Sequence, residues 1–403
     1  MIIRQHYLDK VLPFTDKKLI KVLTGVRRSG KTVLLTQIRD HLISSGVAPE
    51  RIVYISFESV LNEPLQDYHA LYRHLAERAA QAGGRLYIFL DEIQSVSSWE
   101  RAAASLLADL DCDIYISGSN SRLLSGELAT LLAGRYVQIP VYPFTLSEAR
   151  QLLRQNGKEI PDEQLFRDYL RWGGLPMRFS LEPQSVGTYL SDTFDAIVMK
   201  DILSRNQIGD ERLLGLILDF LMDNIANPFS ARSVTAALQS GGVRTTVNTV
   251  LRFIEYIKRA MILNAVPRYD LKGKRLLASA EKYYAVDLGL RNVRRAGAPI
   301  DFNKLYENAV YLELLYRGYE VRVGKTDDYE IDFVASREGE TLYVQVAYLL
   351  ASEETVAREF GNLERIRDQH PKMVISGDLP DFSRNGIRHC NILDFLLEKD
   401  RGL

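Results

Sequence analysis

A glycine-rich segment near the N-terminus, from Gly25 to Thr32, has the spacing GxxxxGK[ST]. It follows the apolar run LIKVLT and precedes the helical pattern TVLLTQIRDHLI, which is the context that this motif requires. Gly25 and Gly30 let the backbone curl so that successive N–H groups point at an anion, and the positive end of the following helix adds to the attraction. Lys31 is predicted to reach the β- and γ-phosphates of a nucleotide, and the hydroxyl of Thr32 to ligate magnesium.

The whole loop is predicted to surround the phosphates. Two of its arginines, Arg27 and Arg28, either contact phosphate or stay exposed to solvent. The predicted nucleotide contacts are Gly25, Arg27, Arg28, Ser29, Gly30, Lys31, Thr32 and Val33.

Two adjacent carboxylates, Asp91 and Glu92, close the apolar run RLYIFLDEI sixty residues after Lys31. A carboxylate at the carboxyl end of a neighbouring parallel strand lies beside the crevice in which ligands of such sheets bind. Asp91 is therefore predicted to hold Mg²⁺, directly or through water, and Glu92 to polarise the attacking water as general base. Alone, such a pair is more often a solvated strand end, but together with the loop it predicts nucleotide hydrolysis.

Polar groups after the next apolar run, CDIYISGS, complete the predicted chemistry. Ser119 or Asn120 either orients the lytic water or senses the γ-phosphate, or the two residues simply cap the helical pattern that follows. Asn120 is the preferred candidate, because its amide can both donate and accept hydrogen bonds. Arg135 either stabilises the transition state in a neighbouring copy of the chain or is a surface arginine at a helix end, and Arg122 is a weaker candidate for that role. The predicted catalytic residues are Lys31, Glu92, Asn120 and Arg135, and the predicted magnesium ligands are Thr32 and Asp91.

The elements that must position these groups are strands and helices in alternation. Short apolar runs and longer mixed segments alternate through the first part of the chain, residues 1–145, which is typical of a parallel sheet with helices on both faces. The expected strands are LIKVLTG, RIVYISFE, RLYIFLDEI, CDIYISGS and RYVQIPV.

The rest of the chain divides into three predicted parts. Residues 146–205 show helical spacing, interrupted at Gly173, and predict a helical lid. Residues 206–298 contain three helical patterns followed by strand-like segments, which suggests a winged helix. Residues 299–403 mix helices and strands in a final α/β unit.

Composition bounds the class of protein. The 403 residues carry 51 basic and 52 acidic side chains, a formal charge of -1, so no overall field draws the chain onto nucleic acid or anionic lipid. The two cysteines, Cys112 and Cys390, exclude a disulfide framework and fit a reducing compartment. No signal-peptide pattern and no run of about 20 apolar residues is present, so we expect a cytoplasmic protein without membrane contact.

Several motifs together resemble bacterial and archaeal AAA-type P-loop ATPases fused to a C-terminal domain of unknown function. The residues that carry the resemblance are GVRRSGKT, YIFLDEIQ, ISGSNSRLL, LAGRYVQIPVYPFTLSE, WGGLP, YLSDTFDAIVMKDILSR and YEIDFVASREGETLYVQVAYLL. The resemblance implies ATP as the nucleotide, since no guanine-reading NKxD segment occurs. It also implies that the nucleotide-site positions of the family are matched by Lys31, Thr32, Asp91, Glu92, Asn120 and Arg135. Arg171 or Arg178 could sense the nucleotide from the lid.

The predicted winged helix could contact DNA. The start of its second helix carries Arg244, Thr245, Thr246, Asn248 and Arg252, and the tip of the expected wing carries Lys272, Lys274 and Arg275. A recognition helix reads DNA through such positions, with basic groups on the phosphates. A packing module is the alternative, and in either case Phe253, Ile254, Ile257 and Ile262 are expected in the core.

The last part resembles the restriction-endonuclease-like PD-(D/E)xK fold. Glu307 and Asp332 match its acidic positions and Gln345 the first position of its (E/Q)xK pattern, but Ala347 stands where that pattern carries its lysine. A methyl group cannot donate a proton or stabilise charge, so the resemblance implies a degenerate domain that binds nucleic acid or protein.

The function that these observations predict is hydrolysis of ATP to ADP and phosphate with Mg²⁺, driving a conformational change of the winged-helix and nuclease-like parts. The expected partners are further copies of the chain, with DNA or another protein as candidates. Two alternatives stay open: a nucleotide-gated scaffold or sensor with little turnover, and a DNA-processing nuclease.

Overall fold

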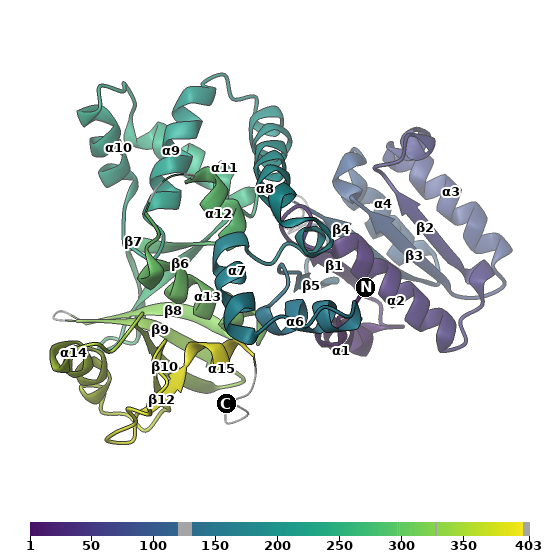
Figure 1. The fold of residues 1–403 in the computed structure, drawn as a ribbon. Helices are drawn as coiled ribbons and strands as arrows, with labels where there is room; N and C mark the ends of the chain where they lie inside the picture. Colours follow the sequence, from purple (N-terminus) through teal and green to yellow (C-terminus); the bar gives the residue numbers. More distant parts are fainter. Residues whose placement is uncertain (120–130, 296, 298, 327–328, 398–403) are drawn as a thin grey trace. The chain divides into compact units, whose positions relative to one another are not determined.

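The computed structural model describes residues 1–403 except 120–130, 296, 298, 327–328 and 398–403. The chain forms two compact units, the first comprising residues 1–142 and 259–261 and the second residues 143–258 and 262–403 (Figure 1). Within the described residues no helix combines the length and the apolar character needed to cross a membrane.

The first unit contains the predicted parallel sheet. Its strand order is β2-β3-β4-β1-β5, and every neighbouring pair is parallel. The strands are β1 (Ile20–Thr24), β2 (Ile52–Ser56), β3 (Leu86–Asp91), β4 (Cys112–Gly118) and β5 (Tyr136–Pro140). All five lie within the expected runs, and the three central strands are buried at every position, as residues covered on both faces must be.

Helices cover this sheet and join its strands. They are α1 (Gln5–Val11), α2 (Lys31–Ser44), α3 (Tyr68–Gln81) and α4 (Trp99–Asp109). Helix α2 packs on β3 and β4, and α3 packs beside α4, in the purple and blue part of Figure 1. The carboxyl ends of β1, β3 and β4 meet at one edge of the sheet, where the chemistry was predicted.

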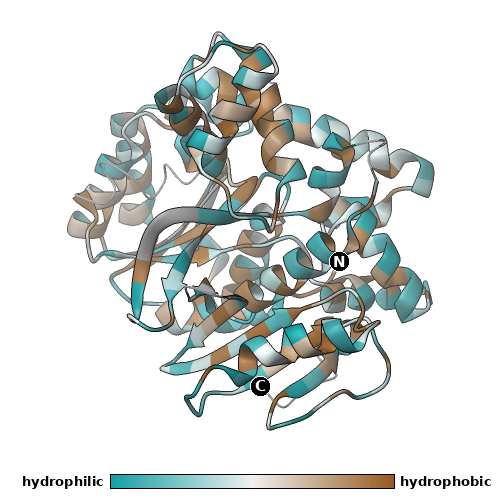
Figure 2. Cartoon of the chain, turned by 90° about the vertical axis from the view of Figure 1, so that its left-hand side faces the viewer, coloured by the Kyte–Doolittle hydropathy of each residue, from teal (hydrophilic) through white to brown (hydrophobic). Residues whose placement is uncertain are grey.

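The second unit is built on a seven-stranded mixed sheet of order β12-β11-β10-β9-β8-β6-β7. Its strands are β6 (Leu263–Asp270), β7 (Arg275–Ala285), β8 (Glu320–Lys325), β9 (Glu330–Arg337), β10 (Glu340–Val346), β11 (Lys372–Ser376) and β12 (Arg388–Asn391). Brown and teal segments alternate along strands of this sheet in Figure 2, as expected where successive side chains point to opposite faces.

Most of the helices in the described part of the chain belong to the second unit. They are α6 (Leu146–Gln155), α7 (Asp162–Trp172), α8 (Pro183–Ile197) with a π-helical continuation (Val198–Ser204), α9 (Glu211–Asp223), α10 (Ala231–Ser240), α11 (Val247–Arg259), α12 (Leu288–Arg294), α13 (Phe302–Tyr316), α14 (Glu353–Glu364) and α15 (Ile392–Leu396). The region of the expected lid is helical, and the chain breaks after α7 at Gly173, whose φ of 70° is left-handed.

The hairpin that we expected as a wing, β6 with β7, belongs to the large sheet. Strand β6 pairs in parallel with β8, so that Arg268 lies opposite Val323. Helices α9, α10 and α11 precede the hairpin in the predicted order, and the four expected core residues of this part are buried: Phe253, Ile254, Ile257 and Ile262. The segment 206–298 therefore shares one sheet with the segment that follows it.

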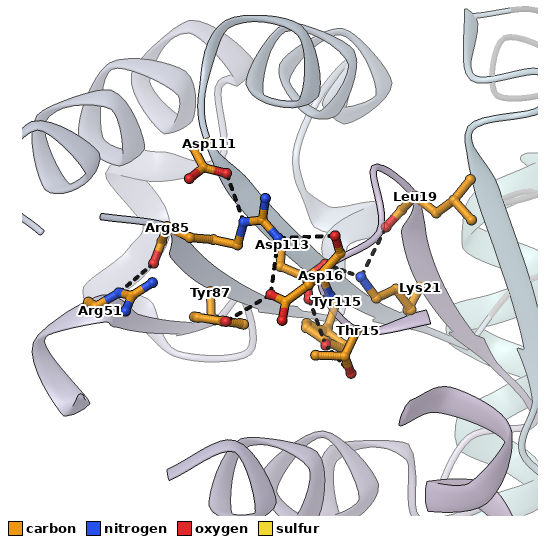
Figure 3. Close-up of polar contacts among 10 residues, drawn as sticks. All are labelled: Thr15, Asp16, Leu19, Lys21, Arg51, Arg85, Tyr87, Asp111, Asp113 and Tyr115. Atoms are coloured by element: carbon orange, nitrogen blue, oxygen red, sulfur yellow. Dashed lines mark hydrogen bonds and ion pairs between the residues drawn. The ribbon is translucent and has the colours of Figure 1, made fainter. Parts of the chain in front are cut away.

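A buried ion pair lies at the amino end of the first sheet (Figure 3). Lys21 of β1 bonds to Asp113 of β4, and both side chains have no exposed surface. Asp113 also accepts hydrogen bonds from the backbone N–H of Asp16 at 3.0 Å and from the Tyr115 hydroxyl at 2.9 Å. Burial lowers the pKa of Lys21, and the charge of Asp113 opposes that shift. The pair joins β1 to β4 and so helps to fix the register of the two strands. The positions of the residues at their carboxyl ends depend on that register.

We expect Asp113→Asn to cost about 3–5 kcal/mol of unfolding free energy, because it leaves the buried Lys21 ammonium without its counter-charge. The double variant Lys21→Met with Asp113→Leu should recover most of that loss, since it removes both charges. Urea unfolding measures both, with the exposed Asp111→Asn as a control that costs less than about 1 kcal/mol. A single variant as stable as the parent chain would contradict this role.

Candidate nucleotide site

The glycine-rich loop runs from the end of β1 into α2. Its backbone turns at two positions that have left-handed φ angles. Gly30 has a φ of 97° at the start of α2, and Arg28 has a φ of 69°. Gly25 is required for a different reason, since a Cβ at this position would lie 2.2 Å from the carbonyl oxygen of Val141. The loop backbone therefore has the tight form that the motif predicts.

The Lys31 amine lies over this loop. Its Nζ donates to the carbonyl oxygens of Gly25 at 3.0 Å and Val26 at 3.1 Å, and the residue is only 4% exposed. The hydroxyl of Ser29 is buried and has no hydrogen-bond partner within the described residues. Unsatisfied buried hydroxyls are rare in proteins, and here one occurs in a loop whose N–H groups suit an oxyanion.

The predicted magnesium ligands lie together. The Oγ1 of Thr32, on α2, donates to the Oδ2 of Asp91 at the end of β3, and the two oxygens are 2.9 Å apart. Ser117 of β4 donates to the other carboxylate oxygen, Oδ1. Asp91 is fully buried, and burial raises its pKa. An exposed threonine hydroxyl beside a carboxylate fits Mg²⁺, a hard cation that prefers oxygen ligands.

Glu92 is held apart from Asp91 by a turn of the backbone. Its φ of 55° is left-handed, a conformation that costs energy in a residue with a side chain and is often found at functional sites. The Glu92 carboxylate accepts a hydrogen bond from Ser119 at 3.2 Å and one from Gln94. Its backbone N–H donates to Ser117 at 3.1 Å. Both carboxylates therefore accept hydrogen bonds from serine hydroxyls, Asp91 from Ser117 on β4 and Glu92 from Ser119 directly after β4.

The other predicted residues separate into distinct groups. Arg27 forms a 3.8 Å ion pair with Glu58, while Arg28 is exposed. Arg135 is exposed and precedes β5, where its carbonyl accepts from Ile20 at the start of β1. Arg135 therefore lies at the amino end of the strands, whereas the glycine-rich loop of the same chain lies at their carboxyl end. Asn120 and Arg122 lie outside the described residues.

Arg4 supports the loop from behind and was not predicted. The residue is 2% exposed, and its guanidinium donates to the carbonyl oxygens of Ser29 at 3.2 Å and Tyr142 at 3.0 Å. It also lies 4.3 Å from the ring centroid of Tyr7, whose hydroxyl accepts from the N–H of Tyr142. The N-terminal segment thereby ties the loop to the end of β5.

In the second unit, two of the matched positions, Glu307 and Asp332, lie together around a lysine, and neither this lysine nor the third carboxylate beside it, Glu330, was predicted. The Nζ of Lys282 lies 3.0 Å from Glu307, 2.8 Å from Glu330 and 3.6 Å from Asp332. Burial alone would lower the pKa of Lys282, but the three carboxylates outweigh that effect and raise it. The side chain of Gln345 accepts from the N–H of Asp332 at 2.8 Å. The described residues hold no group of histidine, cysteine and acidic ligands suited to a metal ion.

The basic residues of the predicted recognition helix are on the surface. Arg244, Asn248 and Arg252 are exposed, as both the DNA-contact and the packing alternatives allow. Of the two lid arginines, Arg178 is buried and its Nε donates to the carbonyl of Gly173 at 2.6 Å. Burial lowers the pKa of Arg178 to about 10.

Comparison with known proteins places this site in a family. Residues 17–150 match an AAA domain, and residues 163–298 match a domain of unknown function, DUF8612. An uncharacterized protein of Haemophilus influenzae is 36% identical over 99% of both chains, and uncharacterized protein MJ1544 of Methanocaldococcus jannaschii is 28% identical over 86% of this chain and 78% of its own. AMPPCP-bound DnaA from Aquifex aeolicus is similar at 13% identity, covering 64% of this chain and 89% of that chain with a TM-score of 0.35.

The full-length match to the relative from Haemophilus influenzae and the AAA domain agree with the loop, the carboxylate pair and the five-stranded sheet. The chain belongs to the family of that relative, and its N-terminal part is an AAA-type P-loop domain.

Proposed function

We propose that this chain is an ATPase that hydrolyses ATP to ADP and phosphate with Mg²⁺ and passes the change of nucleotide state to its C-terminal part. The observation that carries the proposal is the 2.9 Å contact between Thr32 and Asp91, beside a loop over which the Lys31 amine is held. A metal ligand pair and a phosphate-binding amine on one edge of the sheet are what phosphoryl transfer requires.

Each side chain has a defined task in this proposal. Lys31 and the loop N–H groups bind and orient the phosphates, and Mg²⁺ held by Thr32 and Asp91 would neutralise their charge. Glu92 removes a proton from the attacking water, and its hydrogen bonds to Ser119 and Gln94 fix the carboxylate in one orientation. Asn120 would orient the same water.

The C-terminal part is proposed to respond to the nucleotide, with a lid over residues 146–205, a winged helix over 206–298 and a nuclease-like domain over 299–403. Support comes from the helix order before the β6–β7 hairpin and from two exposed arginines, Arg244 just before α11 and Arg252 within it. Lys282 already balances the carboxylates that would otherwise collect metal, which favours a degenerate nuclease-like domain over an active one. DNA and further copies of the chain are the proposed partners.

Glu92→Gln tests the chemical step. The amide keeps the shape of the carboxylate but cannot accept the proton, so we expect ATP binding to persist while turnover falls about 10²- to 10⁴-fold. Steady-state phosphate release and binding of a fluorescent ATP analogue measure the two, with the exposed Glu63→Gln as the matched control. A parent chain that binds ATP but shows negligible turnover, unchanged in Glu92→Gln, would instead indicate a nucleotide-gated scaffold.

Arg135 is proposed to act on the site of a neighbouring copy, because it lies at the far edge of its own sheet. We expect specific activity to rise with protein concentration and to fall at least about 10³-fold in Arg135→Ala. Mixing Arg135→Ala with Glu92→Gln chains should restore part of the activity, since an intact site can then receive an arginine from its neighbour. No recovery on mixing, in oligomers shown to exchange subunits, would contradict the role.

Arg4 is proposed as a positioning residue for the loop. Arg4→Met removes two charge-assisted hydrogen bonds, each worth about 1.5–3 kcal/mol, so we expect ATP affinity to fall at least tenfold while turnover at saturating ATP changes little. Arg39→Met, at an exposed ion pair on α2, is the control. Equal affinity in the parent chain and in folded Arg4→Met, checked by thermal unfolding, would rule this role out.

A further inference from the structure

A cavity of about 650 Å³ lies within the second unit, between α7, α8 and α12. Three of its lining residues are arginines, Arg171, Arg291 and Arg295, and none of the described lining residues is acidic. Trp172 supplies an aromatic surface, and the hydroxyl side chains of the lining are Thr188 and Ser191. The cavity is therefore basic on one part of its wall and apolar on another.

Arg291 is the most unusual residue of this wall. It is 1% exposed, yet no carboxylate pairs with it within the described part of the chain. Its Nε donates to the carbonyl of Met222 and its Nη1 to the side chain of Asn292, both at 3.0 Å, but its Nη2 has no partner. The charges of Asp223 and Asp301 act on Arg291 from a distance, but neither contacts it. A buried guanidinium without a contacting carboxylate is unfavourable, and an anion in the cavity would reduce that cost.

The neighbouring side chains hold this guanidinium in place. The amide of Asn292 donates to the carbonyls of Leu170 and Arg171, both at 2.9 Å, and its oxygen accepts from Arg291. Arg295 pairs with Asp223, and the guanidinium of Arg171 lies 4.6 Å from the ring centroid of Trp172. Burial and the nearby charge of Arg295 lower the pKa of Arg291 to about 10, which leaves it charged at neutral pH.

We propose that this cavity binds a small phosphomonoester. Its phosphate oxygens would pair with Arg171 and Arg295, as guanidinium groups do with phosphate, and would be attracted by the charge of Arg291 in the wall. Its organic part would pack on Trp172. The proposal is independent of the nucleotide loop, because every lining residue belongs to the second unit.

The test uses the full chain carrying Trp99→Phe, which leaves Trp172 as its single tryptophan. The probes are inorganic phosphate, phenyl phosphate and a short single-stranded DNA, titrated at constant ionic strength while Trp172 emission is followed. We expect both phosphate probes to give saturable changes, with phenyl phosphate binding several-fold tighter because its ring reaches Trp172.

Variants in the same background assign the binding to the cavity. Arg291→Met and the exposed Arg171→Met should each weaken phenyl phosphate binding at least tenfold, whereas Arg294→Met, on the same helix but paired with Asp219, should not. Arg171→Met keeps the test decisive if Arg291→Met does not fold. The proposal is overturned by no binding of either phosphate probe, by affinities that the cavity variants leave unchanged, by equal affinity for the two probes, or by arginine-dependent binding of DNA alone.

Discussion

The nucleotide site depends on β4 lying between β1 and β3. Two strand spacings of about 4.8 Å separate the strand that leads into the loop from the strand that ends in the carboxylates. Ser117 lies on this middle strand, and Ser119 follows directly after its last residue, Gly118. The Ser117 hydroxyl donates to Asp91 and the Ser119 hydroxyl donates to Glu92. Adjacent side chains point to opposite faces in an extended strand, but here both carboxylates lie at the carboxyl end of the sheet.

Much of this arrangement follows from local sequence signals. The loop motif, the carboxylate pair and the five strands were predicted because each is encoded within a few consecutive residues. Arg4, Ser117 and Lys282 were missed because their partners are distant in sequence and no periodicity marks such contacts. The pairing of β6 with β8 was missed for the same reason, since strand register between distant segments has no sequence signature.

Buried cations of this chain differ in how completely they are neutralised. Lys21 has Asp113, and Lys282 has three carboxylates, so each has its counter-charge inside the protein. Removing one partner of such a pair would leave an uncompensated buried charge. Arg291 is as deeply buried but has only neutral partners, a carbonyl and a side-chain amide. Among these three residues, Arg291 alone has no carboxylate in contact with it within the described part of the chain.

The β6–β7 hairpin limits how this protein can be divided. A chain ending at residue 298 would keep the hairpin but lose β8, the strand against which β6 pairs, and would expose an unpaired sheet edge to other molecules. A fragment starting at residue 299 would lose Lys282 and leave Glu307, Glu330 and Asp332 clustered without their shared ammonium group. Either cut removes contacts within the sheet, so we expect gene fusions, deletions and recombination between relatives to keep the whole stretch from β6 to β12 together.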